Sequence, residues 1–195
     1  MFSARCAPSV TSILTKEGNG QAVFPLKHQC ELHKVHNQQG IAEMCFVCGE
    51  DNDLGLHAQY LELDDGSLMG IFKPNPKLQS YPDRMHGGVS AAILDETLGR
   101  TLLAVQPNAQ AVTIELNLKY RKPVPLGEEI RAVAHIVKAR SRTFDAQGCI
   151  LLSDGSVAME ATGRFAIMTS EQVGLPDGTN GLHPDTREFP DEVEI

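Results

Sequence analysis

One long helical pattern stands alone between runs of strand-like alternation, and this order constrains the fold most. Residues 88–105 contain no proline and repeat apolar side chains at helical spacing. Strand patterns surround this segment, two before it and four after it, at 54–63, 67–72, 112–120, 130–137, 143–152 and 157–168. Because no second helical pattern is available to cover the apolar side of the helix, the sheet must cover it. The sequence therefore predicts a two-layer α+β domain.

The chain divides into a regular centre and two less regular ends. Residues 1–44 lack a sustained period, and we expect a partly irregular N-terminal extension there. Regular patterning marks residues 45–169 as the predicted domain. Residues 170–195 are rich in glycine, proline and acidic side chains. This composition predicts a solvated tail or, alternatively, an arm that packs on a partner.

The composition disfavours several functional classes. The net charge of −8 argues against nucleic acid and anionic membrane surfaces as partners. No apolar run approaches the ~20 residues that a membrane-spanning helix needs, and the N-terminus does not resemble a secretory signal. Five cysteines, an odd number, do not indicate a disulfide framework, so a reducing cytoplasm is the expected location.

Asp95 occupies an unexpected position on the predicted helix. At about 100° per residue it falls in the middle of the apolar side, between Ala92 and Leu102. Glu96 and Arg100 fall on the polar side, where a solvated ion pair is expected. An ionised carboxylate on a buried side is costly unless it is compensated. Asp95 is therefore either a structural carboxylate with a local hydrogen-bond partner, or a general base or nucleophile in a cleft that excludes water.

The helix begins at a pair of glycines, Gly87 and Gly88. Free N–H groups and the helix dipole favour negative charge there, so this end suits an anion or the carbonyl oxygen of an ester under attack. Alternatively, the glycines only permit a tight turn. Gly88 and Asp95 are separated by roughly 10 Å along the axis, too far for one ester group to touch both. If both act on one substrate, the site lies between subunits of an oligomer, and Val89 and Ile93 suit that contact.

Three features then occur together: the run His86-Gly87-Gly88, the carboxylate of Asp95 nine residues after that histidine, and the strand and corner from Val112 to Pro125. Over about residues 45–168 they resemble the hot-dog-fold acyl-CoA thioesterases, in the phenylacetate-pathway-type (PaaI-like) branch. The resemblance implies an antiparallel six-stranded sheet wrapped around one long central helix. It also implies a homodimer or homotetramer that hydrolyses an acyl-CoA thioester without a metal or other cofactor.

The resemblance implies roles for the motif residues. The helix N-terminal amide near Gly88 polarises the thioester carbonyl, and the neighbouring subunit's Asp95 attacks it directly or activates water. His86 shapes the entrance of the site, and Thr113 places a hydroxyl beside the carboxylate. Ser80 departs from the Asn or Gln that several relatives carry at its position. This difference leaves the orientation of the water or the carbonyl unassigned.

A basic run lies at a predicted connection between two strands. It consists of Lys138, Arg140, Ser141 and Arg142, which together offer three cations and a hydroxyl. Such groups suit the phosphates of coenzyme A, and the resemblance places this corner against the nucleotide. The alternative is a solvated turn.

Cys45 and Cys48 form a Cys-x-x-Cys-Gly motif ahead of the first strand. With Cys30, His33 and His36 upstream, they offer thiolate and imidazole ligands for a tetrahedral zinc site. A redox pair and packed thiols are the alternatives. Packed thiols are favoured because the upstream segment has no other order and a second Cys-x-x-Cys is missing, so we assign no metal.

The leading hypothesis is thus an acyl-CoA thioesterase that uses Asp95 and the start of the helix. A non-catalytic acyl-CoA or lipid-binding protein with the same fold is the second hypothesis, and a zinc-stabilised interaction module is the third. The sequence leaves the acyl group open.

Overall fold

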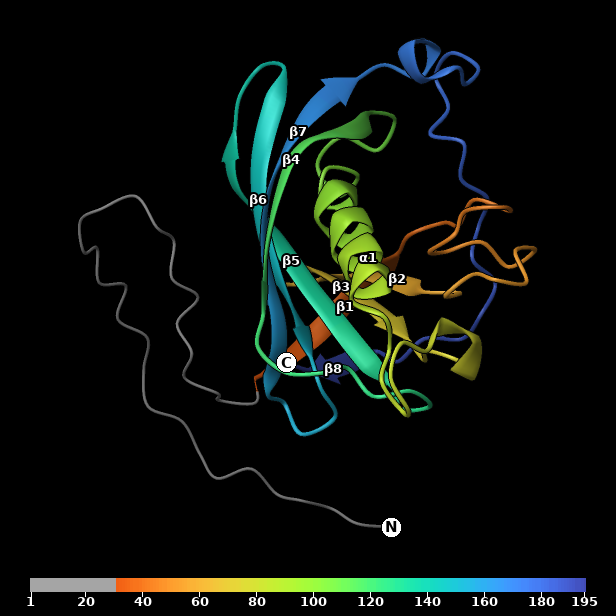
Figure 1. Cartoon of the computed structure of the whole chain (residues 1–195). Helices are drawn as coiled ribbons and strands as arrows, with labels where there is room; N and C mark the ends of the chain where they lie inside the picture. The colour runs from red at the N-terminus through yellow and green to blue at the C-terminus, as the bar shows by residue number, and fades with distance from the viewer. Residues whose placement is uncertain (1–30) are drawn as a thin grey trace, which may run out of the picture.

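The computed structural model describes residues 31–195, which form a single sheet, with strands of different lengths, around one α-helix (Figure 1). In chain order the elements are β1 (Leu32–Gln38), β2 (Gln59–Leu63), β3 (Leu68–Phe72), a 3₁₀ turn (Pro76–Leu78), α1 (Gly87–Arg100), β4 (Gln110–Tyr120), β5 (Ile130–Ala139), β6 (Thr143–Leu151), β7 (Val157–Met168), a second 3₁₀ turn (Glu171–Val173) and β8 (Glu192–Glu194). The strand order is β4-β7-β6-β5-β3-β2-β1-β8, and neighbouring strands are antiparallel. Within residues 31–195, α1 is too short and too polar to span a bilayer. The predicted α+β class, with a sheet wrapped around a central helix, is confirmed.

The helix α1 packs closely against the sheet and so fixes the position of the site. Ile93, Leu94 and Leu98 are fully buried. Leu98 lies over Gly148 of β6, where an added Cβ would come within 2.9 Å of Leu98 Cδ1. The missing side chain therefore lets the helix approach the sheet, and this close packing holds Asp95 at a defined height above it.

The sheet has eight strands instead of the six expected, because segments from both ends of the described chain join it. β1 pairs with β2, and β8 pairs with the other edge of β1. Val193 of β8 is buried at 6% exposure. β1 belongs to the segment that was expected to be partly irregular; residues 1–30 of that segment lie outside the described residues.

The C-terminal segment, residues 170–195, lies against the rest of the chain. His183 and Ile41 exchange two backbone hydrogen bonds of 2.8 Å. Arg187 Nη1 donates to the carbonyl of His57 at 2.7 Å. The structure thus differs from the solvated tail that the composition predicts. Glycine, proline and polar residues are also suited to an irregular segment whose backbone groups pair with another part of the same chain.

The predicted polar side of the helix is also buried. α1 ends at Arg100, earlier than the expected end near Val105. Thr97 is fully buried and Arg100 is only 6% exposed. Tyr60 of β2 covers this side, with its hydroxyl 3.4 Å from Thr97 Oγ1 and its ring 4.5 Å from the Arg100 guanidinium. Because the sheet wraps around both flanks of the helix, the pair of Arg100 with Glu96 is not the solvated pair expected.

Strand β4 forms an edge of the sheet and is less buried than its alternating pattern predicts. Val112, Ile114 and Tyr120 are 42%, 57% and 57% exposed, and a β-bulge interrupts the register after Thr113. Ile93, which was expected at a subunit contact, is instead fully buried within its own chain. β4, in contrast, presents exposed apolar side chains at the edge of the sheet that could form an intersubunit contact.

Candidate active site

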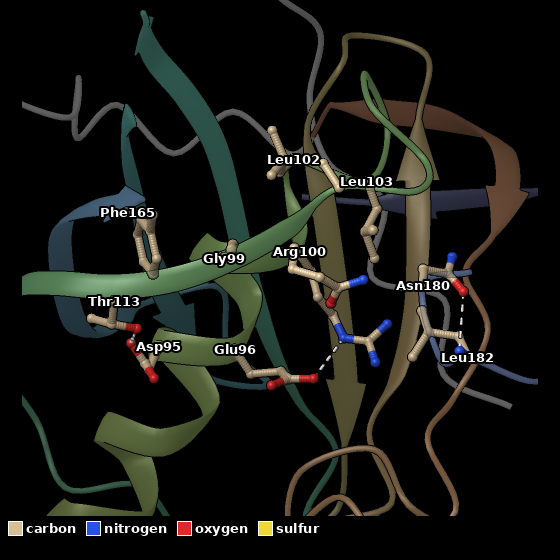
Figure 2. Close-up of a pocket in the computed structure, with 13 residues that line it drawn as sticks. Asp95, Glu96, Gly99, Arg100, Leu102, Leu103, Thr113, Phe165, Asn180 and Leu182 are labelled. Atoms are coloured by element: carbon tan, nitrogen blue, oxygen red, sulfur yellow. Dashed lines mark hydrogen bonds and ion pairs between the residues drawn. The ribbon is translucent and has the colours of Figure 1, made fainter. Parts of the chain in front are cut away.

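Asp95 extends from α1 toward strand β4, where it meets Thr113 (Figure 2). The Thr113 hydroxyl donates a hydrogen bond of 2.8 Å to Asp95 Oδ1. Burial raises the pKa of Asp95; the Thr113 hydrogen bond lowers it and the charge of Glu96 raises it, so the pKa stays above its ordinary value. A half-buried carboxylate of this kind is suited to accept a proton during catalysis.

The start of α1 is organised by His86, which caps the helix. His86 Nδ1 accepts a hydrogen bond of 2.9 Å from the Gly88 N–H. The Gly87 N–H has no acceptor among residues 31–195. The Gly87 carbonyl accepts a 3.1 Å hydrogen bond from Tyr120, whose ring would lie 3.2 Å from a Cβ added at Gly87. Among the described residues, the amide at the start of the helix that is available to a ligand is thus the one at Gly87, whereas the sequence predicts the amide near Gly88.

Ser80 lies in the loop before the helix. Its side chain is exposed and makes no hydrogen bond within the described part of the chain, while its backbone N–H donates to the Arg84 carbonyl at 2.9 Å. The structure therefore does not bring the Ser80 hydroxyl to Asp95 or to another polar side chain of this chain.

A pocket of about 150 Å³ opens beside Asp95. Its walls come from α1 and the loop after it, from β4 and β7, and from the C-terminal segment. The lining includes charged and apolar side chains, among them Asp95, Glu96, Arg100, Leu102, Leu103 and Phe165. Asn180 and Leu182 of the C-terminal segment complete the pocket. The sequence offered no signal for these two residues, because they are flanked by glycine and polar side chains without a period.

The basic turn between β5 and β6 is exposed, and one of its cations is paired. Arg140 Nη2 lies 2.7 Å from Asp145, and Arg164 Nε lies 2.8 Å from the same carboxylate. The hydrogen bonds from Arg140 and Arg164 lower the pKa of Asp145 to about 2. Lys138 and Arg142 form no ion pair with residues 31–195. The turn therefore keeps two cations that an anionic ligand can use.

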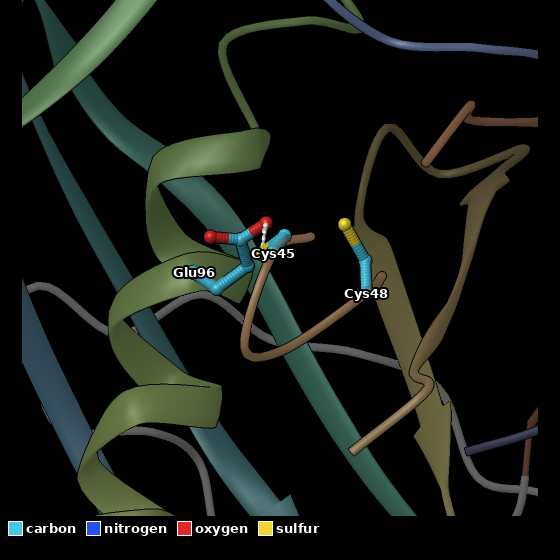
Figure 3. A group of neighbouring side chains, drawn as sticks. All are labelled: Cys45, Cys48 and Glu96. Atoms are coloured by element: carbon cyan, nitrogen blue, oxygen red, sulfur yellow. Dashed lines mark hydrogen bonds between the residues drawn. The ribbon is translucent and has the colours of Figure 1, made fainter. Parts of the chain in front are cut away.

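Cys45 and Cys48 pack beside Glu96 of α1 (Figure 3). The ligand atoms of these three residues lie within 4.8 Å of one another. Cys48 Sγ accepts a 2.9 Å hydrogen bond from Arg100 Nη2, and a guanidinium against the sulfur repels a divalent cation. His33 does not join the cluster, because its Nδ1 lies 3.3 Å from Asp64 instead.

Of the ligands of the alternative zinc site, Cys45 and Cys48 lie together but His33 lies apart from them, and Cys30 lies outside the described residues. The two thiols interact with each other: the hydrogen bond between them lowers the pKa of Cys45 to about 6 and raises the pKa of Cys48. Packed thiols, the favoured alternative, match this arrangement.

Residues 83–159 match the family model of the thioesterase superfamily. This segment contains α1 with Asp95, and Thr113 on β4. A solved thioesterase superfamily protein shares 30% sequence identity and a TM-score of 0.58, over 64% of this chain and 60% of that one. The described residues have the hot-dog fold, and residues 83–159 are similar to the thioesterase superfamily. The resemblance stated from the motifs is confirmed at this level.

Two curated proteins are similar to parts of the hot-dog domain. Acyl-coenzyme A thioesterase 13 of Homo sapiens is 35% identical over 54 residues, which are 28% of this chain and 39% of the relative. Acyl-coenzyme A thioesterase THEM4 of Bos taurus is 26% identical over 129 residues, which are 65% of this chain and 52% of the relative. The chain thus spans about half or less of the length of these relatives. The PaaI protein of E. coli shares the fold at 14% identity and a TM-score of 0.52, over 57% of this chain and 79% of that one.

Proposed function

We propose that the hot-dog domain hydrolyses acyl-CoA thioesters to a free acid and coenzyme A. The observation that carries this proposal is the carboxylate of Asp95, which is half-buried, hydrogen-bonded to Thr113 and adjacent to a pocket. The partial similarity to acyl-coenzyme A thioesterases of two kinds supports the substrate class.

In the proposed reaction the Gly87 N–H donates a hydrogen bond to the thioester carbonyl oxygen and stabilises the negative charge that develops there. Asp95 takes a proton from water, the water oxygen bonds to the carbonyl carbon, and the C–S bond breaks. Asp95 then returns the proton to the departing thiolate, so the products are the acid and the coenzyme A thiol. Direct attack by the Asp95 carboxylate, followed by hydrolysis of the resulting anhydride, uses the same residues.

The proposed site needs two subunits. Gly87 and Asp95 lie on one straight helix, about 12 Å apart along its axis, so one thioester cannot contact both from the same chain. Strand β4 carries Asp95's partner Thr113 and also presents Val112 and Ile114 to solvent at an unpaired sheet edge. A long apolar edge of this kind is suited to pairing with a second copy. We therefore propose a homodimer, or a homotetramer made of two such dimers, with each Asp95 facing the Gly87 amide of the partner subunit.

Ile114→Asp is expected to disrupt this assembly, because an aspartate would be buried in the β4 contact. The native chain should elute with a mass at least twice that of one chain, and the variant should elute as a monomer without thioesterase activity. Leu54→Asp is the matched control, since Leu54 is 61% exposed in a loop away from β4. A native monomer with full activity would contradict the two-subunit site.

The pH profile tests the role of Asp95 as a base. Since burial holds the pKa of Asp95 above its ordinary value, kcat/KM is expected to fall as the pH drops through that raised pKa. Thr113→Val removes the hydrogen bond that lowers the pKa, so the acid limb of the profile should move to higher pH. Thr113→Ser keeps a hydroxyl and should leave the limb in place. An acid limb that moves to lower pH in the valine variant would argue against this assignment.

The coenzyme A moiety is proposed to contact the basic turn. Lys138 and Arg142 are exposed there, and Ser141 lies between Arg142 and the paired Arg140. Two cations and a hydroxyl at one turn match the phosphates of the nucleotide. The cytoplasm is the proposed location, because the free thiols of Cys45, Cys48 and Cys149 are stable in a reducing compartment.

A non-catalytic acyl-CoA-binding protein is the second candidate, and the exposed, unengaged hydroxyl of Ser80 favours it. The position that carries an amide in several similar proteins supplies no contact to the site here. Thiol release from a panel of acyl-CoAs separates the two candidates. An enzyme turns over at least one of them, whereas a sensor binds them without releasing coenzyme A.

A further inference from the structure

The C-terminal segment forms one wall of the pocket that contains Asp95. Figure 2 shows Asp95 and Thr113 on one side of the pocket and Asn180 and Leu182 on the other, with Glu96 between them. This wall lies outside residues 83–159, the part of the chain that matches the superfamily model. The wall is therefore a feature that this chain adds to the matched segment.

The backbone around Leu182 is anchored on both sides. Asn180 Nδ2 donates to the Pro107 carbonyl at 3.0 Å, and Asn180 Oδ1 accepts from the Leu182 N–H at 3.0 Å. On the other side, His183 and Ile41 exchange two backbone hydrogen bonds of 2.8 Å. Because Asn180 and His183, on either side of Leu182, are tied to other parts of the domain, the backbone holds the Leu182 side chain at one place in the pocket wall.

The pocket is small, at about 150 Å³. For comparison, a closed apolar cavity of about this volume holds one benzene ring, which has six carbon atoms, whereas this pocket opens to solvent and also contains charged side chains. Leu102, Leu103 and Phe165 supply apolar contacts for such a group. If Asp95 acts on the thioester at one side of the pocket, the acyl group extends toward Leu182 at the other.

We propose that Leu182 sets the upper size limit of the acyl group, so that the preferred substrates are CoA esters of short aliphatic or single-ring acids. This inference rests on the proposed thioesterase function. Leu182 acts as a specificity-determining residue in it and takes no part in bond cleavage.

The test compares kcat/KM for butanoyl-, hexanoyl-, decanoyl- and phenylacetyl-CoA in native protein, Leu182→Ala and Leu182→Phe. Leu182→Ala removes carbons from the pocket wall and should raise the ratio of kcat/KM for decanoyl-CoA to that for butanoyl-CoA on the order of 10-fold. The reason is that a single methylene in an apolar pocket changes the discrimination between substrates by about that factor or more. The phenylalanine variant should lower the same ratio. Leu175→Ala, a half-buried leucine of the same segment outside the pocket lining, should leave the ratio unchanged.

A second readout separates this inference from the proposed reaction. The dissociation constants of butyl- and decyl-CoA thioethers, which cannot be hydrolysed as thioesters, are measured for the same variants. If native protein releases no thiol but Leu182→Ala binds decyl-CoA more tightly than native protein does, the size limit holds and the hydrolysis proposal fails. Leu182 does not set the limit if two ratios are the same in all variants: the kcat/KM ratio of decanoyl- to butanoyl-CoA, and the ratio of the dissociation constants of the two thioethers. The same conclusion follows if a substitution lowers kcat/KM equally for all chain lengths.

Discussion

Asp95→Asn is expected to lower kcat by a factor of about 10² to 10⁴ while the protein stays folded. The asparagine keeps the shape of the side chain and can still accept the 2.8 Å hydrogen bond from Thr113, but it cannot take a proton from water or attack a carbonyl as a carboxylate does. The measurement is thiol release under saturating acyl-CoA, with the dissociation constant of a CoA thioether as a check that binding is retained.

The same substitution should make the protein more stable at neutral pH. The folded-state pKa of Asp95 is raised, so the folded protein binds this proton more tightly than the unfolded chain does. The free energy of unfolding therefore falls as the pH rises from the ordinary pKa of an aspartate through the raised pKa of Asp95. At neutral pH the ionised carboxylate thus destabilises the folded protein. Asparagine removes that cost, and a thermal melt records the gain.

Glu115→Gln is the matched control for Asp95→Asn, because Glu115 is an exposed carboxylate of β4 close to Thr113 in sequence. It should retain native turnover. Native turnover in Asp95→Asn would refute the catalytic assignment of Asp95. A variant that loses both turnover and folding would refute the claim that the ionised Asp95 carboxylate lowers the stability of the fold.

Arg100→Met is expected to reduce the free energy of unfolding by about 3–5 kcal/mol. Arg100 Nε pairs with Glu96 at 2.7 Å, Nη1 donates to the Gly40 carbonyl at 3.0 Å and Nη2 donates to Cys48 at 2.9 Å. Burial lowers the pKa of Arg100, but the charges of Glu96, Cys48 and Tyr60 together raise it above its ordinary value, so the guanidinium stays charged. Methionine preserves much of the volume and leaves all three partners without their donor. Urea denaturation gives the difference.

Arg121→Met provides the comparison with an exposed ion pair. Arg121 is 52% exposed and lies 2.9 Å from Glu160, and such a pair contributes below about 1 kcal/mol. Equal losses in the two variants would mean that the network around Arg100 adds nothing beyond a surface pair. Arg100→Lys should fall between native protein and Arg100→Met, because an ammonium keeps the charge but cannot reach three separate acceptors.

Local patterns in the sequence were sufficient for the elements around the helix. The alternation from Val112 to Tyr120 correctly predicts strand β4, and the proline-free run after Gly87 correctly predicts α1. The exposed edge at Ile114 could not be predicted, because alternation identifies the two faces of a strand but not whether a neighbour covers them. Likewise, helical spacing places Arg100 on a polar side, but only the wrapped sheet buries that side beneath Tyr60.

In the candidate site, too, some residues could be predicted from the sequence and others depend on the tertiary structure. Asp95 stood out because a charge on an apolar helical side needs an explanation, and Thr113 followed from the resemblance. Leu182 could not be found in this way, because its place depends on a hydrogen-bonded path of the chain from Asn180 to His183. The exchange of roles between Gly87 and Gly88 also depends on geometry, since only the rotamer of His86 decides which amide is occupied.

The cap at the start of α1 determines the chemical character of His86. Because Nδ1 accepts the Gly88 N–H, the neutral imidazole must carry its hydrogen on Nε2. The exposed end of this ring is therefore a hydrogen-bond donor and not a base. Protonation would turn Nδ1 into a donor aimed at another donor and would force the ring away from the glycine. In the proposed reaction, the tautomer that stabilises the end of the helix thus suits His86 to hold an oxygen atom of the ligand, while Asp95 removes the proton.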